Sequence, residues 1–507
     1  MTSHPISPPD ADSLRSRLFA QDPRLLEAAK RLANAVNATD DTSGAAQPRA
    51  LIVGGFVRDA IFGGHPKDLD VEVFGVPPAR LEELLNGLYP GLVNTVGRSF
   101  GILKVHLADD IEFDVSIPRR ESKSGTGHRG FAIEGDPTMS VEDAARRRDF
   151  TVDAIYADPL TGDIIDPFKG LQDLTDGVLR IVDATQFADD PLRVYRAIQL
   201  AARLNLTTGS QTLDLLRQMV KRGDLEQLAK ERVTDELKKL LLKSEKPSIG
   251  FALARELGIV ERYWPELRVL ESTNQEPEWH PEGNVWIHTL MVTDQAAKII
   301  RQPERGFSEE EKLEVMLGAL CHDLGKASTT KIEEGRIRSR GHEAAGVEAA
   351  RSFLSHFTFG ETIGHAAEEV AGEHLKPVML YKSREAGQMT DAQYTNAVRK
   401  LVTRIYPTSW RVLLASAEAD MRGRGIPGAD TIPYAPGPAF IKAVEQLDLA
   451  HEAPKTLLQG RDLLALGVPA GPRIGELIQH VEDLRDEGTI TTKQEALSEI
   501  EKQLTKS

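Results

Sequence analysis

The sequence of 507 residues is almost free of cysteine, because Cys321 is the only one. A single thiol cannot form an internal disulfide bond or build a cysteine-rich zinc site, and this usage is typical of a reducing compartment. No apolar run approaches the roughly 18 residues that a transmembrane helix needs. The first residues also lack the apolar core of a secretory signal. We therefore expect a cytoplasmic protein without a membrane partner, preceded by a short disordered lead.

Positive charge is in deficit as well, because 62 lysines and arginines face 77 aspartates and glutamates, giving a net charge of −15. This balance argues against a protein that coats nucleic acid without regard to sequence, since such binding needs many cationic contacts to phosphates. A small basic groove that holds one RNA end remains compatible with it. Any case for nucleic acid must come from motifs.

The length indicates about three domains, at roughly 150 residues each. Short runs rich in β-branched residues predict strands from about residue 49 to 157. Apolar spacings of three and four predict helices from about residue 173, with a loop or linker at 275–284. The Pro/Gly-rich residues 423–440 are interpreted as a linker, and the tail is again helical in pattern.

These patterns predict an α+β fold, with an N-terminal mixed-sheet head followed by all-α domains. The boundaries that we expect are an N-terminal lead and helix at 1–48, the head at 49–157, a helical neck at 158–265, a second functional domain at 266–430, and a helical tail at 431–507.

The densest motif is a strand that runs into Gly54-Gly55, a helix, and then Asp68-Leu69-Asp70 at the start of a second strand. Two glycines let backbone N–H groups approach a phosphate, and a helix N-terminus favours an anion. Positions i and i+2 of a strand share one face, so Asp68 and Asp70 project together as ligands for two Mg²⁺ ions. Asp114, on a strand expected to be a neighbour, is a third candidate.

Together these elements resemble the signature of the class II tRNA nucleotidyltransferase and bacterial poly(A) polymerase family. Further motifs of that family follow in order: residues 119–131 resemble its flexible loop, 147–151 its RRDFT motif, 164–174 the stretch after it, 189–193 its EDxxR motif, and Glu231-Arg232 a supporting helix.

The resemblance implies an enzyme that adds C, C and A to the 3′ end of tRNA from CTP and ATP, with Mg²⁺ as cofactor. It assigns catalysis to Asp68, Asp70 and Asp114, the first two as metal ligands. It assigns nucleotide binding to Gly54, Gly55, Arg58, Arg148, Asp149, Asp189, Asp190, Arg193 and Arg196. The neck becomes a base-reading and RNA-binding domain.

Base selection without a nucleic-acid template requires protein groups that match a base edge. Asp190 and Arg193, at i and i+3, share one helix face and offer an acceptor and donors. A site built on such hydrogen bonds rejects bases that leave buried polar groups unpaired. Alone, the pair would be interpreted as a surface ion pair.

Two positions depart from the family pattern. Asp189 stands where the family has Glu, and Asp153 where it has Asn. The shorter Asp189 puts fine base selectivity in doubt. Asp153 adds a charge near the phosphates, unless an arginine such as Arg148 pairs with it.

A second set of residues resembles the HD phosphohydrolase superfamily, most clearly in His322-Asp323-Leu324-Gly325-Lys326. We expect a metal site made by His288, His322, Asp323 and Asp420, to which His342 and His374 would add a second metal. Imidazole favours a transition metal such as Mn²⁺ or Ni²⁺. A bound metal would lower the pKa of water for attack on a phosphate ester.

Three classes of function stay open. The first is an RNA 3′-end nucleotidyltransferase, in which CCA, CC, A or poly(A) addition are alternatives. The second is an HD phosphohydrolase whose head only binds nucleotide, and the third is a scaffold with both sites silent. The order of transferase before HD domain, and a tail of mixed charge, favour CCA addition. The oligomeric state stays open.

Overall fold

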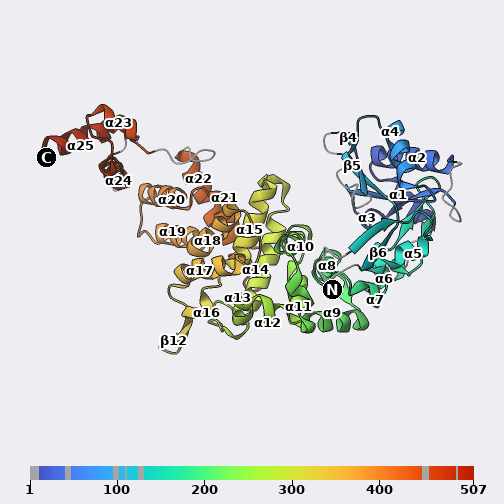
Figure 1. The fold of residues 1–507 in the computed structure, drawn as a ribbon. Helices are drawn as coiled ribbons and strands as arrows, with labels where there is room; N and C mark the ends of the chain where they lie inside the picture. The colour runs from blue at the N-terminus through green and yellow to red at the C-terminus, as the bar shows by residue number, and fades with distance from the viewer. Residues whose placement is uncertain are drawn as a thin grey trace. The chain divides into compact units, whose positions relative to one another are not determined.

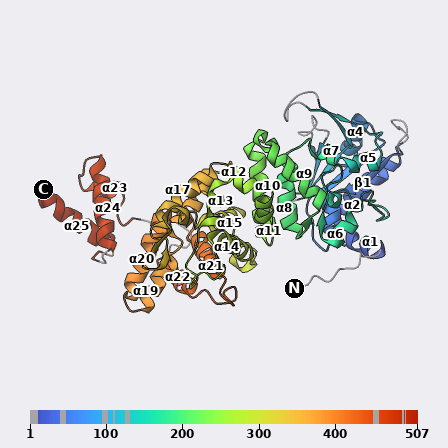
Figure 2. The same cartoon turned by 90° about the horizontal axis from the view of Figure 1, so that it is seen from below.

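The computed structural model describes residues 11–39, 47–94, 102–108, 111–123, 131–447, 456–486, 489–490 and 492–506. The chain divides into two compact units, Met1–Val260 and Glu261–Ser507 (Figures 1 and 2). The first unit contains a sheet and its covering helices, whereas the second is almost entirely helical. The predicted order, a mixed-sheet head followed by helical regions, is confirmed.

A seven-stranded sheet forms the head, in the order β3-β4-β5-β2-β1-β8-β9. The strands are β1 (Arg49–Val53), β2 (Leu69–Phe74), β3 (Val93–Asn94), β4 (Ile102–Ala108), β5 (Ile111–Ser116), β8 (Tyr156–Ala157) and β9 (Ile164–Ile165). The pair β2–β5 is parallel and the other pairs are antiparallel, so the sheet is mixed. A separate antiparallel ribbon consists of β6 (Arg119–Lys123) and β7 (Phe131–Gly135).

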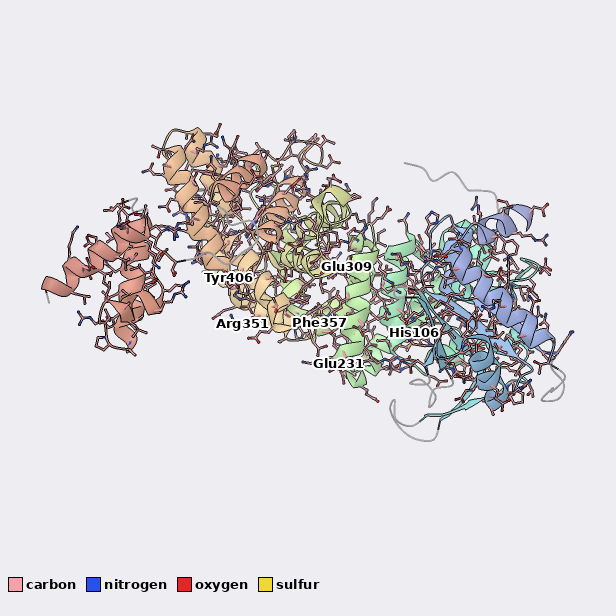
Figure 3. The ribbon with its side chains drawn as sticks, turned by 90° about the horizontal axis from the view of Figure 1, so that it is seen from above. His106, Glu231, Glu309, Arg351, Phe357 and Tyr406 are labelled. Carbon is pink, nitrogen blue, oxygen red and sulfur yellow. The ribbon has the colours of Figure 1, made fainter. Side chains whose placement is uncertain are left out.

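Helices complete the first unit. Those that accompany the sheet are α1 (Ala11–Phe19), α2 (Pro23–Asn37), α3 (Gly55–Ile61), α4 (Pro78–Leu88), α5 (Val141–Arg146) and the 3-10 turn η3 (Thr151–Asp153). Those that follow are α6 (Gly170–Asp176), α7 (Ala184–Phe187), α8 (Leu192–Leu204), α9 (Ser210–Arg222), α10 (Lys230–Lys243) and α11 (Pro247–Glu256), with the short strands β10 (Val178–Leu179) and β11 (Thr207–Thr208). Helix α8 packs against α10 and α11. Glu231, near the start of α10, is marked in Figure 3.

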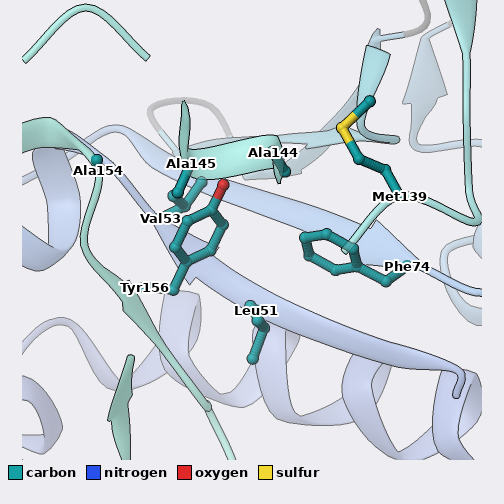
Figure 4. Packing of buried hydrophobic residues seen from close by; sticks show 8 residues of the cluster. All are labelled: Leu51, Val53, Phe74, Met139, Ala144, Ala145, Ala154 and Tyr156. Carbon is teal, nitrogen blue, oxygen red and sulfur yellow. The ribbon is translucent and has the colours of Figure 1, made fainter. Parts of the chain in front are cut away.

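Alternation along the strands decides which side chains reach the open part of the sheet. In β2, Leu69, Val71 and Val73 are buried, whereas Asp70 and Glu72 point to the other face. That second face is covered in part by an apolar cluster, to which β1 contributes Leu51 and Val53 (Figure 4). The cluster also contains Phe74, Met139, Ala144, Ala145, Ala154 and Tyr156. Because Val53 lies opposite Asp70, the carboxylate stands at the edge of this cluster.

The second unit has a helical core in which α15 packs against α14, α18 and α21, and α17 packs against α18. Its helices begin with α12 (Ile259–Tyr263), at the division between the units, and continue with α13 (Pro265–Arg268), α14 (Val285–Ile299), α15 (Glu309–Cys321), α16 (Lys326–Thr329), α17 (His342–Leu354), α18 (Glu361–Glu373), α19 (Lys376–Glu385), α20 (Asp391–Ile405), α21 (Trp410–Arg422) and α22 (Pro436–Gln446). A hairpin, β12 (Lys331–Glu333) and β13 (Arg336–Arg338), precedes α17. Within the described residues no helix has both the length and the apolar character that crossing a membrane requires.

The C-terminal helices have an apolar cluster of their own. They are α23 (Gly460–Ala465), α24 (Pro472–Asp486) and α25 (Lys493–Lys506). The buried members of the cluster are Leu458, Leu463, Val468, Leu477, Val481, Ile490, Ala496 and Ile500. The predicted helical tail is thus a small packed element.

Gly325 provides a test of the packing between α15 and α17. A Cβ atom at this position would lie 2.1 Å from the carbonyl oxygen of His342 and 2.4 Å from the amide nitrogen of Gly346. We predict that Gly325→Ala lowers the free energy of unfolding of the second unit by at least about 2 kcal/mol, because backbone must move to make room. Chemical denaturation followed by circular dichroism measures this loss.

Gly364→Ala is the matched control. Gly364 lies inside α18 and an added Cβ would meet nothing within 4 Å. Alanine favours a helix interior by about 0.5–1 kcal/mol over glycine, so this variant should be as stable as the parent or more so. Equal stability of both variants would show that the close contact at Gly325 relaxes without cost.

Candidate active site and candidate metal centre

Three carboxylates gather at the start of β2. Asp70 lies directly beside Asp114, because β2 and β5 pair in parallel with these two residues in register. Asp68 precedes β2 by one residue, and both Asp68 and Asp70 are exposed on the open face. Partial burial raises the pKa of Asp70 to about 6, and the like charges of Asp114 and Asp68 act in the same direction, against Arg148. Such a group of like charges suits a divalent cation.

Lys104, on β4, is a further member of this group that sequence reasoning missed. Its ammonium lies 3.1 Å from Asp114 Oδ1 and 3.0 Å from Glu112 Oε1. Lys104 is directly opposite Asp114 in the antiparallel pair β4–β5. The side chain is half-exposed, so this ion pair leaves Asp114 accessible.

Gly54 brings the turn between β1 and α3 close to the carboxylates. Its φ of +74° favours glycine, and a Cβ atom there would lie 3.1 Å from Arg148 Nη1 and 3.9 Å from Asp70 Oδ2. Arg148 also lies 3.8 Å from Glu72 Oε2, and Glu72 accepts a hydrogen bond of 2.7 Å from the Tyr156 hydroxyl. Glu72 and Tyr156 were not identified from the sequence. Both side chains lie against Arg148, the arginine beside Gly54 and Asp70.

Asp153 is neutralised by partners other than the one expected. It forms ion pairs with Arg58 and Arg196 rather than with Arg148. Arg58 is almost fully buried and also pairs with Asp59 at 2.7 Å. Burial opposes its charge, but Asp153 and Asp59 outweigh this effect and raise the pKa of Arg58.

Asp149 extends the same network, since it pairs with Arg196. These ion pairs thus connect α3, η3 and α8 beside β2. Of the expected nucleotide-binding residues, Arg58, Asp149 and Arg196 hold this frame, and Gly55 lies against it, because its Cβ would be 3.4 Å from Arg58 Nη2.

Asp190 and Arg193 are each held by other groups, and the described residues show no ion pair between their side chains. Asp190 Oδ2 accepts from Arg232 Nη2 at 2.9 Å, and Oδ1 accepts from the amide of Leu192 at 3.1 Å. Arg193 donates to the carbonyl oxygens of Gln186 at 2.8 Å and Arg147 at 3.0 Å. The surface ion pair that was the alternative interpretation is therefore absent.

Around this pair, the guanidinium of Arg193 lies over the ring of Phe187, with 5.7 Å to the ring centroid. Asp189 is exposed, and its amide donates to the carbonyl oxygen of Gln186 at 3.3 Å. Part of the expected flexible loop, residues 124–130, lies outside the described residues.

The six residues expected to bind metal in the second unit come together in one buried cluster. His288 lies on α14, His322 and Asp323 follow α15, His342 begins α17, His374 ends α18, and Asp420 lies on α21. His288 Nε2 is 3.1 Å from Asp420 Oδ1 and 3.3 Å from His322 Nε2. Asp323 lies at the centre, with Oδ2 3.2 Å from His322 Nε2 and Oδ1 3.5 Å and 3.9 Å from the Nε2 atoms of His342 and His374.

Each histidine is oriented through its other nitrogen. Nδ1 of His322, His342 and His374 donates to the carbonyl oxygen three residues earlier in the chain, at Ala319, Ser339 and Ala371. Nδ1 of His288 donates to Glu282 Oε1 at 2.8 Å. Carbonyl and carboxylate oxygens only accept, so a proton lies on each of these Nδ1 atoms. The four Nε2 atoms therefore face the cluster, where a metal could take their lone pairs.

This arrangement fits a cation. The Nε2 atoms of His288 and His322 lie 3.3 Å apart, and Asp323 Oδ1 and His342 Nε2 are buried without a hydrogen-bond partner in the described residues. Buried polar atoms are otherwise paired almost without exception. Burial alone would lower the pKa of His288, but the neighbouring carboxylates of Asp420 and Glu282 outweigh burial and raise this pKa. Burial and the neighbouring His322 lower the pKa of His374 to about 4.

The segments interpreted as a loop and a linker both contribute to this centre. Glu282, from residues 275–284, contacts His280, His288 and the amide of Gly425. Residues 423–440 pack against the centre through Gly425 and through Arg424, whose Nη2 lies 3.7 Å from Asp420 Oδ2. The only sequence signal for either contact is the close spacing of Glu282 to His288 and of Arg424 to Asp420.

Three protein-family models match parts of the chain. Residues 50–180 match the poly A polymerase head domain, residues 205–270 match the probable RNA and SrmB-binding site of polymerase A, and residues 285–400 match the HD domain.

Solved structures share the fold over nearly the whole chain. A CCA-adding enzyme in complex with ATP has a TM-score of 0.61 at 18% identity, covering 96% of this chain and 98% of that one. The Bacillus stearothermophilus CCA-adding enzyme in complex with CTP has a TM-score of 0.60 at 21% identity, covering 96% and 99%.

Curated relatives are more similar in sequence. The multifunctional CCA protein of Stenotrophomonas maltophilia is 34% identical over 85% of this chain and 97% of its own length, and that of Nitrosococcus oceani is 33% identical over 84% and 95%. The chain thus belongs to the multifunctional CCA proteins, HD-domain-containing members of the CCA-adding tRNA nucleotidyltransferase and poly(A) polymerase family.

Proposed function

We propose that the first unit adds C, C and A to the 3′ end of tRNA, using CTP and ATP, and that the second unit hydrolyses phosphate esters. The observation that carries the first part is the register of Asp70 and Asp114 beside Gly54 and Arg148. Two divalent cations, which we expect to be Mg²⁺, would activate the attacking hydroxyl and neutralise the leaving group. The family membership supports the same reaction.

In this reaction, the terminal ribose oxygen of tRNA bonds to the α-phosphorus of the nucleotide, and the bond to the β-phosphate oxygen breaks to release pyrophosphate. Asp68 and Asp70 hold the cations, with Asp114 beside them. Gly54 and Gly55 let backbone N–H groups approach the triphosphate. Arg148 stands next to Gly54 and supplies a positive charge for phosphate oxygens.

Asp190 and Arg193 then select the base. Both side chains are half-buried and oriented, Asp190 by Arg232 and Arg193 by two backbone carbonyl groups. A held acceptor and a held donor group can match the polar edge of C or A without a template strand. The negative charge of Asp153 does not disturb the bound triphosphate, because Arg58 and Arg196 neutralise it.

For the second unit we propose a metal-dependent phosphohydrolase that converts a phosphomonoester and water into an alcohol and inorganic phosphate, or opens a 2′,3′-cyclic phosphodiester. A bound metal would lower the pKa of a water and polarise the phosphoryl oxygen. Four histidines favour a transition metal such as Mn²⁺ or Ni²⁺ over Mg²⁺. His288, His322, Asp323 and Asp420 form the first site, and His342 and His374 face the other oxygen of Asp323.

The first prediction concerns the reaction itself. We expect the protein with Mg²⁺ to extend a tRNA transcript that lacks CCA with CTP and ATP, to add only A to one that ends in CC, and to leave a complete tRNA unchanged. Asp70→Ala should reduce extension at least about a thousandfold, or roughly 4 kcal/mol at about 1.4 kcal/mol per tenfold, because a metal ligand is lost. Gel analysis with each nucleotide supplied separately measures both results.

Asp163→Ala is the control, because Asp163 is an exposed carboxylate of the same unit that pairs with Arg15 at its surface. It should extend tRNA at the parental rate. Near-parental extension by Asp70→Ala would contradict the proposed site. Addition of C alone, A alone or a long run of A would replace CCA addition by one of the alternative reactions.

Arg193→Ala tests base selection. The change removes the donors of the base-reading pair, so we expect a loss of discrimination among the four nucleotides or a loss of activity with both CTP and ATP, by about tenfold or more. Incorporation of each nucleotide into a tRNA acceptor measures this. Arg24→Ala, at an exposed arginine of α2 that pairs with Asp22, is the control. Unchanged selectivity at full rate would remove Arg193 from the proposed role.

The double variant His322→Ala/Asp323→Ala tests whether the two activities are separate. It removes two central ligands from the metal cluster of the second unit, so hydrolysis of 2′,3′-cyclic AMP and of a 2′-phosphomonoester should disappear. Extension of tRNA should stay within about twofold of the parent, because the catalytic carboxylates belong to the other unit. Loss of both activities in a variant that still folds, as shown by circular dichroism, would mean that the units are coupled.

A further inference from the structure

A Gly-Arg-Gly segment directly after α21 is pressed against the metal centre. A Cβ atom on Gly423 would lie 2.5 Å from Val292 Cγ2 and 2.7 Å from the amide nitrogen of Val292 on α14. A Cβ atom on Gly425 would lie 2.8 Å from Glu282 Cβ and 2.9 Å from the Glu282 amide nitrogen. Side chains are therefore excluded on both sides of Arg424, which fixes the position of its backbone.

A hydrogen-bonded chain connects this segment to a metal-centre histidine. The amide of Gly425 donates to Glu282 Oε2 at 2.9 Å, and the other oxygen of the same carboxylate accepts from His288 Nδ1 at 2.8 Å. Glu282 is almost fully buried. The carboxylate that sets the orientation of His288 therefore also sets the place of Arg424.

The guanidinium of Arg424 lies at the edge of the cluster and keeps hydrogen-bond donors that are not paired within the described residues. Its Nη2 lies 3.7 Å from Asp420 Oδ2, which is longer than a hydrogen bond, while Asp420 Oδ1 faces His288 Nε2 at 3.1 Å. Its Nε is buried and has no hydrogen-bond partner among the described residues. About a quarter of the side chain, 27%, is exposed, so a ligand from solvent can reach it.

Lys326 occupies the equivalent place at the other ligand carboxylate. Its ammonium lies 2.7 Å from Asp323 Oδ2 and donates to Gln275 Oε1 at 2.8 Å. The two aspartates meet around His288, whose Nε2 is 3.1 Å from Asp420 and 3.6 Å from Asp323. Lys326 is therefore engaged by Asp323 and Gln275, whereas the buried Nε of Arg424 has no hydrogen-bond partner among the described residues.

We propose that Arg424 forms a phosphate-binding subsite beside the metal centre, which holds the non-bridging oxygens of the phosphoryl group to be hydrolysed. A planar guanidinium donates two parallel hydrogen bonds to a phosphate, and its charge offsets the negative charge brought by the substrate. The inference rests on the hydrolysis proposed for the second unit and names the residues that recognise its substrate.

The test measures phosphate binding directly. The full chain is loaded with Mn²⁺, its metal content is determined, and inorganic phosphate is titrated by isothermal calorimetry. Arg424→Gln should keep the metal content and melting temperature of the parent but bind phosphate about tenfold more weakly or worse. Arg424→Lys should bind several-fold more weakly than the parent, because it keeps the charge and loses the planar pair of donors. Arg351→Gln, at an exposed arginine of the same unit that pairs with Glu368 (Figure 3), should bind like the parent.

Two results would overturn the inference. If Arg424→Gln binds phosphate with the parental affinity, Arg424 is no more than a partner of Asp420. If Arg424→Gln loses its metal, Arg424 instead supports Asp420 as a metal ligand. If Arg424→Gln does not fold, parental affinity in Arg424→Lys is the contradicting result. The two proposals can fail separately. If phosphate binding depends on Arg424 but the protein hydrolyses no phosphate ester, the result contradicts the proposed hydrolysis alone. If Arg424→Gln changes neither hydrolysis nor phosphate binding, the result contradicts the subsite alone.

Discussion

Both sites depend on holding several ligands of the same kind within a few ångströms of each other. In the head the groups are the carboxylates around Asp70, whose repulsion helps to raise its pKa to about 6. In the second unit they are imidazole nitrogens, of which the Nε2 atoms of His288 and His322 lie 3.3 Å apart. Neither arrangement is stable by itself, because like groups repel and burial removes their hydration. The surrounding fold must supply the restraint until a cation binds.

The restraint has a different physical form in each unit. In the head, backbone pairing places Asp70 beside Asp114, and the ion pairs of Arg58 and Arg196 with Asp153 and Asp149 join the neighbouring helices. In the second unit, hydrogen bonds from Nδ1 to backbone carbonyl groups orient three of the four histidines. Strand register is enough to position carboxylates that remain accessible to solvent. Buried imidazoles must in addition have their proton fixed on one nitrogen, so that the other nitrogen can bind a metal.

Close backbone approach recurs wherever a site is assembled. Gly54 lets Arg148 and Asp70 meet, Gly325 lets the start of α17 reach the His-Asp pair, and Gly425 lets the segment after α21 reach Glu282. At each position a Cβ atom would meet backbone or a functional side chain. Close packing at these glycines thus helps to position both sites. A side chain added there would strain the packing, so the geometry of the sites and the stability of the fold depend on the same contacts.

The sequence by itself determined what depends on short stretches of chain. The two-residue period of a strand placed Asp68 and Asp70 on one side, and the strand–glycine–helix order and the HDLGK string identified the family and both groups of candidate residues. Mixed-sheet and helical regions followed from periodicity, because apolar spacing differs between strands and helices. The tertiary structure decided which distant groups meet: Asp153 with Arg58, 95 residues apart, and Gly425 with Glu282, 143 apart. No local pattern encodes such pairs, since they exist only once helices far apart in the chain have packed. For the same reason, residues interpreted from the sequence as a linker lie against the candidate metal centre.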